Sequence, residues 1–309
     1  MLTIFSCPKP FQGRINTIQR NAIGSWILLE PKPEIILIGN EQGTAEICRE
    51  FNLHHVPDVE RNEYGTPLVN SVWQVAQSAA GTGVMMYVNT DIILLSDFMR
   101  AVEGIRTVLN GSNFLLFGGR WNVDDAPIAF DGDNWEDKLK KFVKQHGWLD
   151  NRIAMDYFVF PRNIDWKLPP FSLGRQSWDS WFPYRAAKMS VPAIDISDCV
   201  TAIHQNHDYS HFQSRRGISP QNPEVSYNFR LLGFGRRYTI LDASHKLVGK
   251  ELISQKSIVR FLVERSREIP LWMMYFVRRT HPYSYPLYLL FKGVKMSQSI
   301  FCRPSTTRH

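Results

Sequence analysis

The sequence lacks a long hydrophobic run, since no segment reaches the roughly 18 consecutive apolar residues that a membrane-spanning helix needs. It also begins without the basic and then apolar pattern of a secretion signal, because its first residues, MLTIF, have the pattern of a strand. We therefore expect a cytoplasmic protein with no spanning helix.

Cysteine is scarce, and the four cysteines are far apart in the chain, at Cys7, Cys48, Cys199 and Cys302. No two of them have the CxxC spacing of a zinc or redox motif. Four cysteines so far apart also do not indicate a disulfide framework. We expect reduced thiols and a fold that is stabilised by its core.

Net positive charge is missing from most of the chain, although the whole chain carries +7. Residues 250–309 hold eleven Lys and Arg against three acids, so this segment carries +8 and residues 1–249 carry −1. That balance excludes nucleic acid as a partner of the first 249 residues. The basic residues of 250–309 alternate with aromatic ones, which predicts a helical extension in peripheral contact with an anionic membrane, on its inner face. Packing of these aromatics against the rest of the chain is the alternative.

Short apolar runs alternate with longer amphipathic ones, and this alternation predicts an α/β fold with a mostly parallel sheet flanked by helices. The expected strands are Leu2–Phe5, Glu34–Ile38, Val84–Val88, Phe114–Phe117, Tyr157–Phe160 and Val191–Ile196. The expected helices are Ile15–Leu29, Ala45–Phe51, Thr66–Ala80 with Thr66 as cap and Pro67 in the first turn, 96–109, 135–145, and one that starts near Ser177 or Trp178. We expect an α/β domain over 1–212, a loop or lid over 213–249, and the extension over 250–309.

The strongest local motif is Asn89-Thr90-Asp91, which follows the apolar strand that ends at Val88. Ligands of open parallel sheets bind at the carboxyl ends of the strands, where these side chains are expected. A carboxylate there can bind Mn²⁺ or Mg²⁺, which in turn binds a diphosphate. An Asx turn is the alternative.

This motif resembles the DXD motif of GT-A glycosyltransferases, with Asn89 in place of the first Asp, and the resemblance covers residues 1–212 in the order of elements. It implies a Rossmann-like GT-A fold in which Asp91 binds the metal and Asn89 hydrogen-bonds ribose or phosphate. GT-A enzymes often add one late His to the metal ligands, which implies this role for His204, or else His207.

His204 and His207 belong to a dense cluster, with three His and one Asp in residues 204–211. A structural histidine is one alternative. A hydrolytic zinc site is another, although the Glu of a zincin is missing, since Gln205 and Asn206 lie between the two histidines.

Asp179 lies at an expected helix start, after Gly174 and Arg175. An inverting transfer needs a carboxylate to accept the proton of the acceptor hydroxyl, and the resemblance implies this role for Asp179. Trp178 and Trp181 are expected to stack on the acceptor, which Arg175 is also expected to contact. A capping Asp beside two core tryptophans is the alternative.

Several other residues follow expected strands and are weaker candidates. We expect Ser6, Lys9, Asn40 and Glu41 to contact the nucleotide, and Arg120, Trp121 and Asp156 to contact the phosphate or the acceptor. Simple turns, or solvent exposure in the case of Arg120, are the alternatives.

These features together predict metal-assisted, inverting transfer of a sugar from a UDP- or GDP-sugar to a saccharide or lipid-linked acceptor. A nucleotidyltransferase of similar fold and a non-catalytic nucleotide- or sugar-binding protein are the alternatives.

Overall fold

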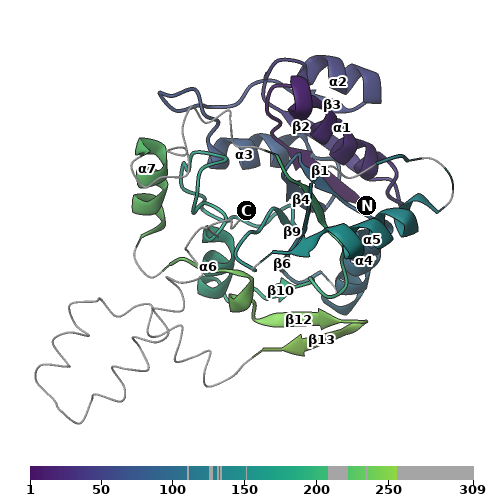
Figure 1. Cartoon of the computed structure of the whole chain (residues 1–309). Helices are drawn as coiled ribbons and strands as arrows, with labels where there is room; N and C mark the ends of the chain where they lie inside the picture. Colours follow the sequence, from purple (N-terminus) through teal and green to yellow (C-terminus); the bar gives the residue numbers. More distant parts are fainter. Residues whose placement is uncertain are drawn as a thin grey trace, which may run out of the picture.

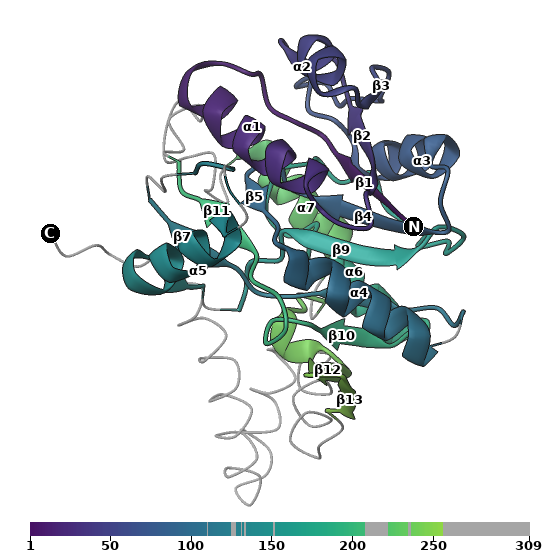
Figure 2. The same ribbon diagram turned by 90° about the vertical axis from the view of Figure 1, so that its right-hand side faces the viewer.

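The structure is a computed structural model that describes residues 1–109, 111–124, 128–130, 132, 134–150, 152–207, 222–233 and 236–255. Its centre is a nine-stranded sheet with helices on both faces (Figures 1 and 2). In sheet order the strands are β13 (Glu251–Ser254), β12 (His245–Val248), β10 (Ala193–Asp195), β6 (Leu115–Phe117), β9 (Tyr157–Pro161), β4 (Val84–Val88), β1 (Leu2–Ser6), β2 (Glu34–Ile38) and β3 (His54–Val56). Five pairings are parallel, and the antiparallel ones involve β9 and the edge strand β13.

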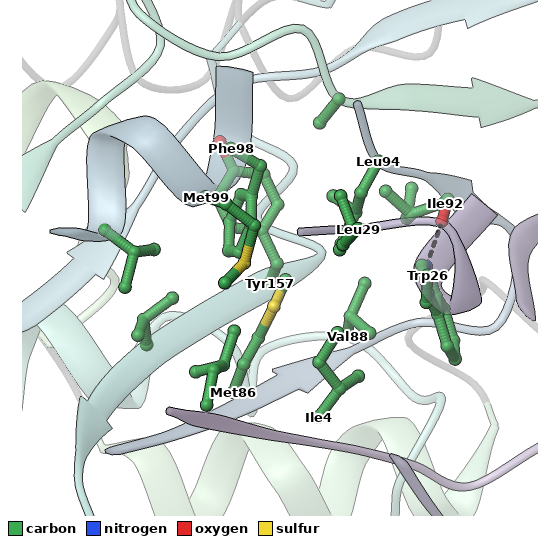
Figure 3. Close-up of a cluster of buried hydrophobic side chains, with 14 of the residues drawn as sticks. Ile4, Trp26, Leu29, Met86, Val88, Ile92, Leu94, Phe98, Met99 and Tyr157 are labelled. Atoms are coloured by element: carbon green, nitrogen blue, oxygen red, sulfur yellow. Dashed lines mark hydrogen bonds between the residues drawn. The ribbon is translucent and has the colours of Figure 1, made fainter. Parts of the chain in front are cut away.

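The two faces of the sheet have separate cores, because alternate residues of a strand point to opposite faces. In β4, Met86 and Val88 pack under α1 (Gly13–Ile27), α2 (Thr44–Phe51) and α4 (Ser96–Leu109), as Figure 3 shows for part of this core. Met85 and Tyr87 pack on the other face, under α3 (Val69–Ala79), α6 (Trp181–Lys188) and α7 (Pro223–Leu232).

A second, four-stranded sheet lies beside the carboxyl end of β4, in the order β5 (Ile92–Ile93), β11 (Ile203–Gln205), β7 (Trp121–Val123) and β8 (Trp148–Leu149). Helix α5 (Trp135–His146) covers one of its faces, where Leu139 and Val143 pack on Ile93, Val123 and Ile203. This small sheet joins β4 directly to the expected histidine cluster.

The expected fold class, a mixed and mostly parallel sheet flanked by helices, is confirmed, but two helices begin later than expected. Thr66 and Pro67 do not start α3, since Pro67 is in a β-bridge with Arg61 and its carbonyl accepts from Leu173 N. Helix α6 cannot begin at Ser177, because Ser177 has a φ of 84°, in the left-handed region that an α-helix excludes. It begins at Trp181, so Asp179 lies in the turn before it.

The segment 213–249, expected to be a loop, contains regular structure where it is described. Helix α7 begins at a proline after Asn222, whose side chain accepts from the Glu224 and Val225 amides. A 3₁₀ turn (Ile240–Asp242) and strand β12 follow, and β13 extends the sheet past residue 249. The main sheet therefore crosses both of the expected boundaries, at 212 and at 249.

The aromatic extension expected to contact a membrane lies outside the described residues from 256 onward. Within the described part of the chain, no helix has the length and apolar character needed to cross a membrane.

Candidate metal centre

Asp91, His204 and His207 come together next to the carboxyl end of β4. Asp91 immediately precedes β5, and β5 pairs with β11 so that Ile92 lies opposite His204. Asp91 Oδ2 is 3.2 Å from His207 Nε2 and 3.6 Å from His204 Nε2. One ligand atom from each residue lies within 4.8 Å of the others, a spacing that suits a shared metal ion.

The surroundings of the three side chains fit a cation. Asp91 Oδ1 is buried and has no hydrogen-bond partner among the described residues, which is rare for a carboxylate oxygen. Both imidazoles are buried, with exposed fractions of 4% for His204 and 9% for His207. A bound divalent ion supplies the positive partner that the orphaned oxygen lacks, and one carboxylate with two imidazoles is an ordinary ligand set for such an ion.

The tautomer of His204 follows from its neighbours. His204 Nδ1 is 3.0 Å from Asn122 Oδ1 and 3.1 Å from Asn206 Oδ1. Each amide is oriented by a carboxylate, because Asn122 Nδ2 donates to Asp150 and Asn206 Nδ2 donates to Asp124, both at 3.0 Å. Both atoms facing Nδ1 are therefore acceptors, so Nδ1 carries a proton, and Nε2 is the ring nitrogen that faces Asp91.

Lys9 adds positive charge beside this cluster. Burial alone would raise the pKa of Asp91, but His204 and His207, together with Lys9, hold that pKa well below its ordinary value. Burial lowers the pKa of Lys9; the charge of Asp91 opposes this shift and the charge of Arg175 adds to it. Lys9 therefore lies within electrostatic reach of both Asp91 and Arg175.

Asn89 and Arg120 each bond to Asp156, so these three residues, expected to contact the ligand, form one network in the structure. Asn89 accepts from the Tyr87 hydroxyl at 2.9 Å and donates to Asp156 Oδ1 at 2.8 Å. Arg120 donates to Asp156 Oδ2 at 2.7 Å, and its Nε is 3.6 Å from Asp150. The network joins the ends of β4, β6 and β9. The charges of Arg120 and Asp156 are largely buried, so each needs a partner inside the protein.

Asp179 is half-buried, and its Oδ1 accepts from Ser180 N at 2.9 Å. Burial raises the pKa of Asp179 to about 6, and the nearby charge of Asp156 also raises it. The hydrogen bond from the Ser180 amide and the charge of Arg237 oppose this shift. The carboxylate is thus more basic than an exposed aspartate.

The expected aromatic platform of Trp178 and Trp181 is wrong, because both rings are in the core. Trp178 is 5% exposed and packs edge-on against Trp73 and Tyr87, and Trp181 is 8% exposed beside Phe171. The side chain of Trp121 likewise packs on the core under α5. These rings fill space beneath the site.

The residues expected to contact the nucleotide differ in accessibility. Ser6 is fully buried and bonds to the Val88 carbonyl at 2.6 Å and to Thr90 Oγ1 at 2.8 Å, so it fastens β1 to β4 and cannot line an open site. Asn40 is exposed after β2, and the neighbouring Glu41 accepts from Arg61 at 2.7 Å. Both follow a strand parallel to β1 and β4, so they lie at the same edge of the sheet as Asp91.

Sequence reasoning missed Glu224, which orients Arg175. Glu224 is 5% exposed, and its two oxygens accept from Arg175 Nε at 2.7 Å and from Asn62 Nδ2 at 2.8 Å. Asn222-Pro223-Glu224 is a readable helix start, and it would have placed this acid in the first turn of a helix. Asn122 and Asn206 were also missed, since nothing in the sequence shows which amides face a histidine.

No known protein family and no curated protein matches the sequence. Solved structures do match in fold. S. aureus TarS in complex with UDP-GlcNAc is 10% identical over 69% of this chain and 61% of that chain, with a TM-score of 0.44. Glucosyl-3-phosphoglycerate synthase from Mycobacterium tuberculosis, in complex with Mn²⁺, UDP and phosphoglyceric acid, is 14% identical over 75% and 77% of the chains, with a TM-score of 0.43.

A putative glucose-1-phosphate thymidylyltransferase from Bacillus anthracis is 9% identical over 74% of this chain and 95% of that chain, with a TM-score of 0.40. The chain spans about three fifths of the TarS chain. The similarity to these structures is one of fold.

Proposed function

We propose that the protein is a glycosyltransferase that moves a sugar from a nucleoside-diphosphate donor, a UDP- or GDP-sugar, to a saccharide or lipid-linked acceptor. The observation that carries the proposal is the cluster of Asp91, His204 and His207 at the carboxyl edge of a mostly parallel sheet, with Lys9 beside it. Ligands of such sheets bind at that edge, and diphosphates are bound there by metal ions and cationic side chains.

In this proposal Asp91, His204 and His207 hold one Mn²⁺ or Mg²⁺ ion. When bound, the ion neutralises the diphosphate and stabilises it as a leaving group. Lys9, and Arg175 as oriented by Glu224, add positive charge for the phosphate oxygens. Asn40 and Glu41 lie at the neighbouring strand end, where the nucleoside would extend along the same edge.

Asp179 is the proposed general base of an inverting transfer. The acceptor hydroxyl gives its proton to the carboxylate while its oxygen bonds to the anomeric carbon, and the bond from that carbon to the diphosphate oxygen breaks. A pKa of about 6 suits this role, since the carboxylate is ionised at neutral pH and is still a better base than an ordinary aspartate.

A zinc hydrolase is a second candidate, because Asp91 lies beside both histidines and completes a set of three ligands. Asp91 with His204 and His207 gives two imidazoles and one carboxylate, which is a ligand set of catalytic zinc sites. Lys9 beside Asp91 favours a phosphate-bearing substrate and therefore the transferase.

Calorimetric titration separates the two candidates. We expect UDP or GDP to bind tightly only when Mn²⁺ or Mg²⁺ is present, and turnover of the matching nucleotide-sugar in an acceptor screen. Binding of Zn²⁺ without any metal-dependent binding of a nucleoside diphosphate would contradict the transferase and favour the hydrolase.

A further inference from the structure

Trp148 differs from the other tryptophans of the described residues in being exposed. It lies in β8, the edge strand of the small sheet, with 48% of its surface accessible. The other described tryptophans are buried or half-buried. An indole held in a strand and open to solvent is available to an apolar surface of a ligand.

The pairing of the small sheet places Trp148 on the same face as His204. Ile92 lies opposite His204, His204 lies opposite Asn122, and Asn122 lies opposite Trp148. Directly paired residues project to the same face of a sheet, so these four side chains form one row across it. The row leads from the candidate metal ligand His204, through Asn122 which binds it, to the exposed indole.

The neighbouring row projects to the opposite face and includes Leu149. It consists of Ile93, Ile203, Trp121 and Leu149, and Ile93 and Ile203 pack under α5. Leu149 is 53% exposed, about as much as Trp148, but it lies on the face that α5 covers. Exposure is thus similar in the two residues of β8, and only their face differs.

Strand β8 is fixed against the site from both ends. A side chain at Gly147 would place its Cβ 2.7 Å from the Val143 carbonyl and 2.9 Å from the Asn122 carbonyl, so glycine is required for the chain to pass this closely. After the strand, Asp150 N donates to the Arg120 carbonyl at 2.9 Å, and its carboxylate accepts from Asn122. Trp148 is therefore held in register with Asn122 and His204.

We propose that Trp148 is the platform on which a sugar ring of the acceptor stacks, and this inference rests on the proposed glycosyltransferase function. One face of a pyranose ring presents C–H groups that pack on an indole, while its hydroxyls stay in water. Two strand spacings separate Trp148 from His204 in the sheet, about 10 Å, which is beyond the phosphates that a metal ion contacts. The sugar that receives the new bond, rather than the diphosphate, fits at this distance.

The test measures glycoside binding by saturation-transfer NMR titration on the whole protein with Mn²⁺ and UDP, using methyl glycosides of glucose, galactose and N-acetylglucosamine as probes. Trp148→Ala is compared with Leu149→Ala, the matched exposed residue on the other face, and with Trp148→Phe, which keeps an aromatic ring. We expect Trp148→Ala to weaken the best glycoside by about tenfold or more, as truncation of an aromatic anchor does. Leu149→Ala and Trp148→Phe should stay within about twofold of wild type. Trp148→Gln replaces Trp148→Ala if the alanine variant does not fold.

Binding of UDP with Mn²⁺ is measured on every variant and should not change. Equal losses in Trp148→Ala and Leu149→Ala, no loss in either, or a loss of UDP binding in Trp148→Ala would overturn the platform. A wild-type protein that binds UDP with Mn²⁺ but none of the glycosides also overturns it and leaves the transferase proposal standing. Absence of Mn²⁺-dependent UDP binding in wild type contradicts the proposed function itself.

Discussion

At the scale of single residues, the site depends on one buried carboxylate between two imidazoles. We expect Asp91→Ala to abolish metal-dependent binding of the nucleoside diphosphate while the fold persists, since Oδ1 has no described hydrogen-bond partner and Oδ2 contacts the two histidines of the candidate site. Calorimetry with UDP and Mn²⁺, beside circular dichroism, measures both. Nucleotide binding with an unchanged Mn²⁺ requirement would show that Asp91 is not a ligand.

Asn122 orients the candidate metal ligand His204. The substitution Asn122→Ala removes one of the two acceptors that face His204 Nδ1 and leaves that of Asn206. The ring is then held less firmly with Nε2 toward Asp91. We expect the affinity for Mn²⁺ to fall by about 10- to 100-fold, the usual effect of losing a partner of a metal-binding histidine. Mn²⁺ titration followed by electron paramagnetic resonance measures this, with the exposed Asn163→Ala as control. An unchanged Mn²⁺ affinity in Asn122→Ala would refute the orienting role.

As the proposed general base, Asp179 would link turnover to pH. A base must be deprotonated to accept the acceptor proton, so kcat/KM should rise with pH through about 6, where half of the carboxylate is ionised, and level off at higher pH. Asp179→Asn should lower turnover by ~10²-fold or more and remove this rise, with donor affinity little changed. Steady-state rates of wild type and variant between about pH 5 and about pH 8, which brackets the pKa of Asp179, test this prediction. Near-normal turnover in the Asn variant would leave Asp179 as part of a turn.

At the scale of elements, the sequence predicts those whose pattern is local. The strand Val84–Val88 and the helix at 96–109 were expected with the bounds that the structure has, because a buried strand and an amphipathic helix carry their own periodicity. The two-residue strands β5 and β8 have no such pattern, since they exist only through pairing with distant chain. That Asp91 and His204 lie close together could be expected from their places beside strands. The two amides that face His204 Nδ1, those of Asn122 and Asn206, could not be predicted in this way.

The tryptophans show why a residue type does not give its environment. A Trp-rich loop next to a strand end suits both a sugar platform and a core, and the sequence favoured the platform at Trp178 and Trp181. The structure places both in the core, and among the described residues the exposed indole is that of Trp148. The deciding contacts, such as Trp178 with Trp73, join residues about a hundred positions apart, which local patterns do not record.

Glu224 in helix α7 accepts hydrogen bonds from Arg175 and Asn62. Glu224→Ala leaves the partly buried Arg175 guanidinium without its nearest carboxylate, and should reduce the free energy of unfolding by roughly 2–4 kcal/mol. Nucleotide affinity should fall as well, since Arg175 loses its orientation. Urea unfolding and UDP titration measure the two effects, with the exposed Glu46→Ala on α2 as control. A variant as stable as that control would show that the pair contributes little.

At the scale of the whole molecule, the positive excess of the chain lies after the last described strand. Residues 256–309 hold ten Lys and Arg and two acids, so they carry +8 and exceed the net charge of the full chain, +7. The sheet extends to Ser254, because β13 pairs with β12. A cut at Gly249 would remove β13 and expose β12, whereas a chain that ends at Gln255 keeps the whole described sheet.

We therefore expect the full chain to bind liposomes that contain anionic lipid at low salt, and the chain that ends at Gln255 to lose that binding while it stays folded. Each basic residue near such a surface contributes up to about 1 kcal/mol, and salt screens this attraction, so binding should weaken as ionic strength rises. Flotation with anionic and neutral liposomes, together with the thermal melting of both chains, measures it. Equal flotation of the two chains would place the contact within residues 1–255. Loss of the folded state in the shorter chain would show instead that the aromatics of 256–309 belong to the core, and the membrane role would then be abandoned.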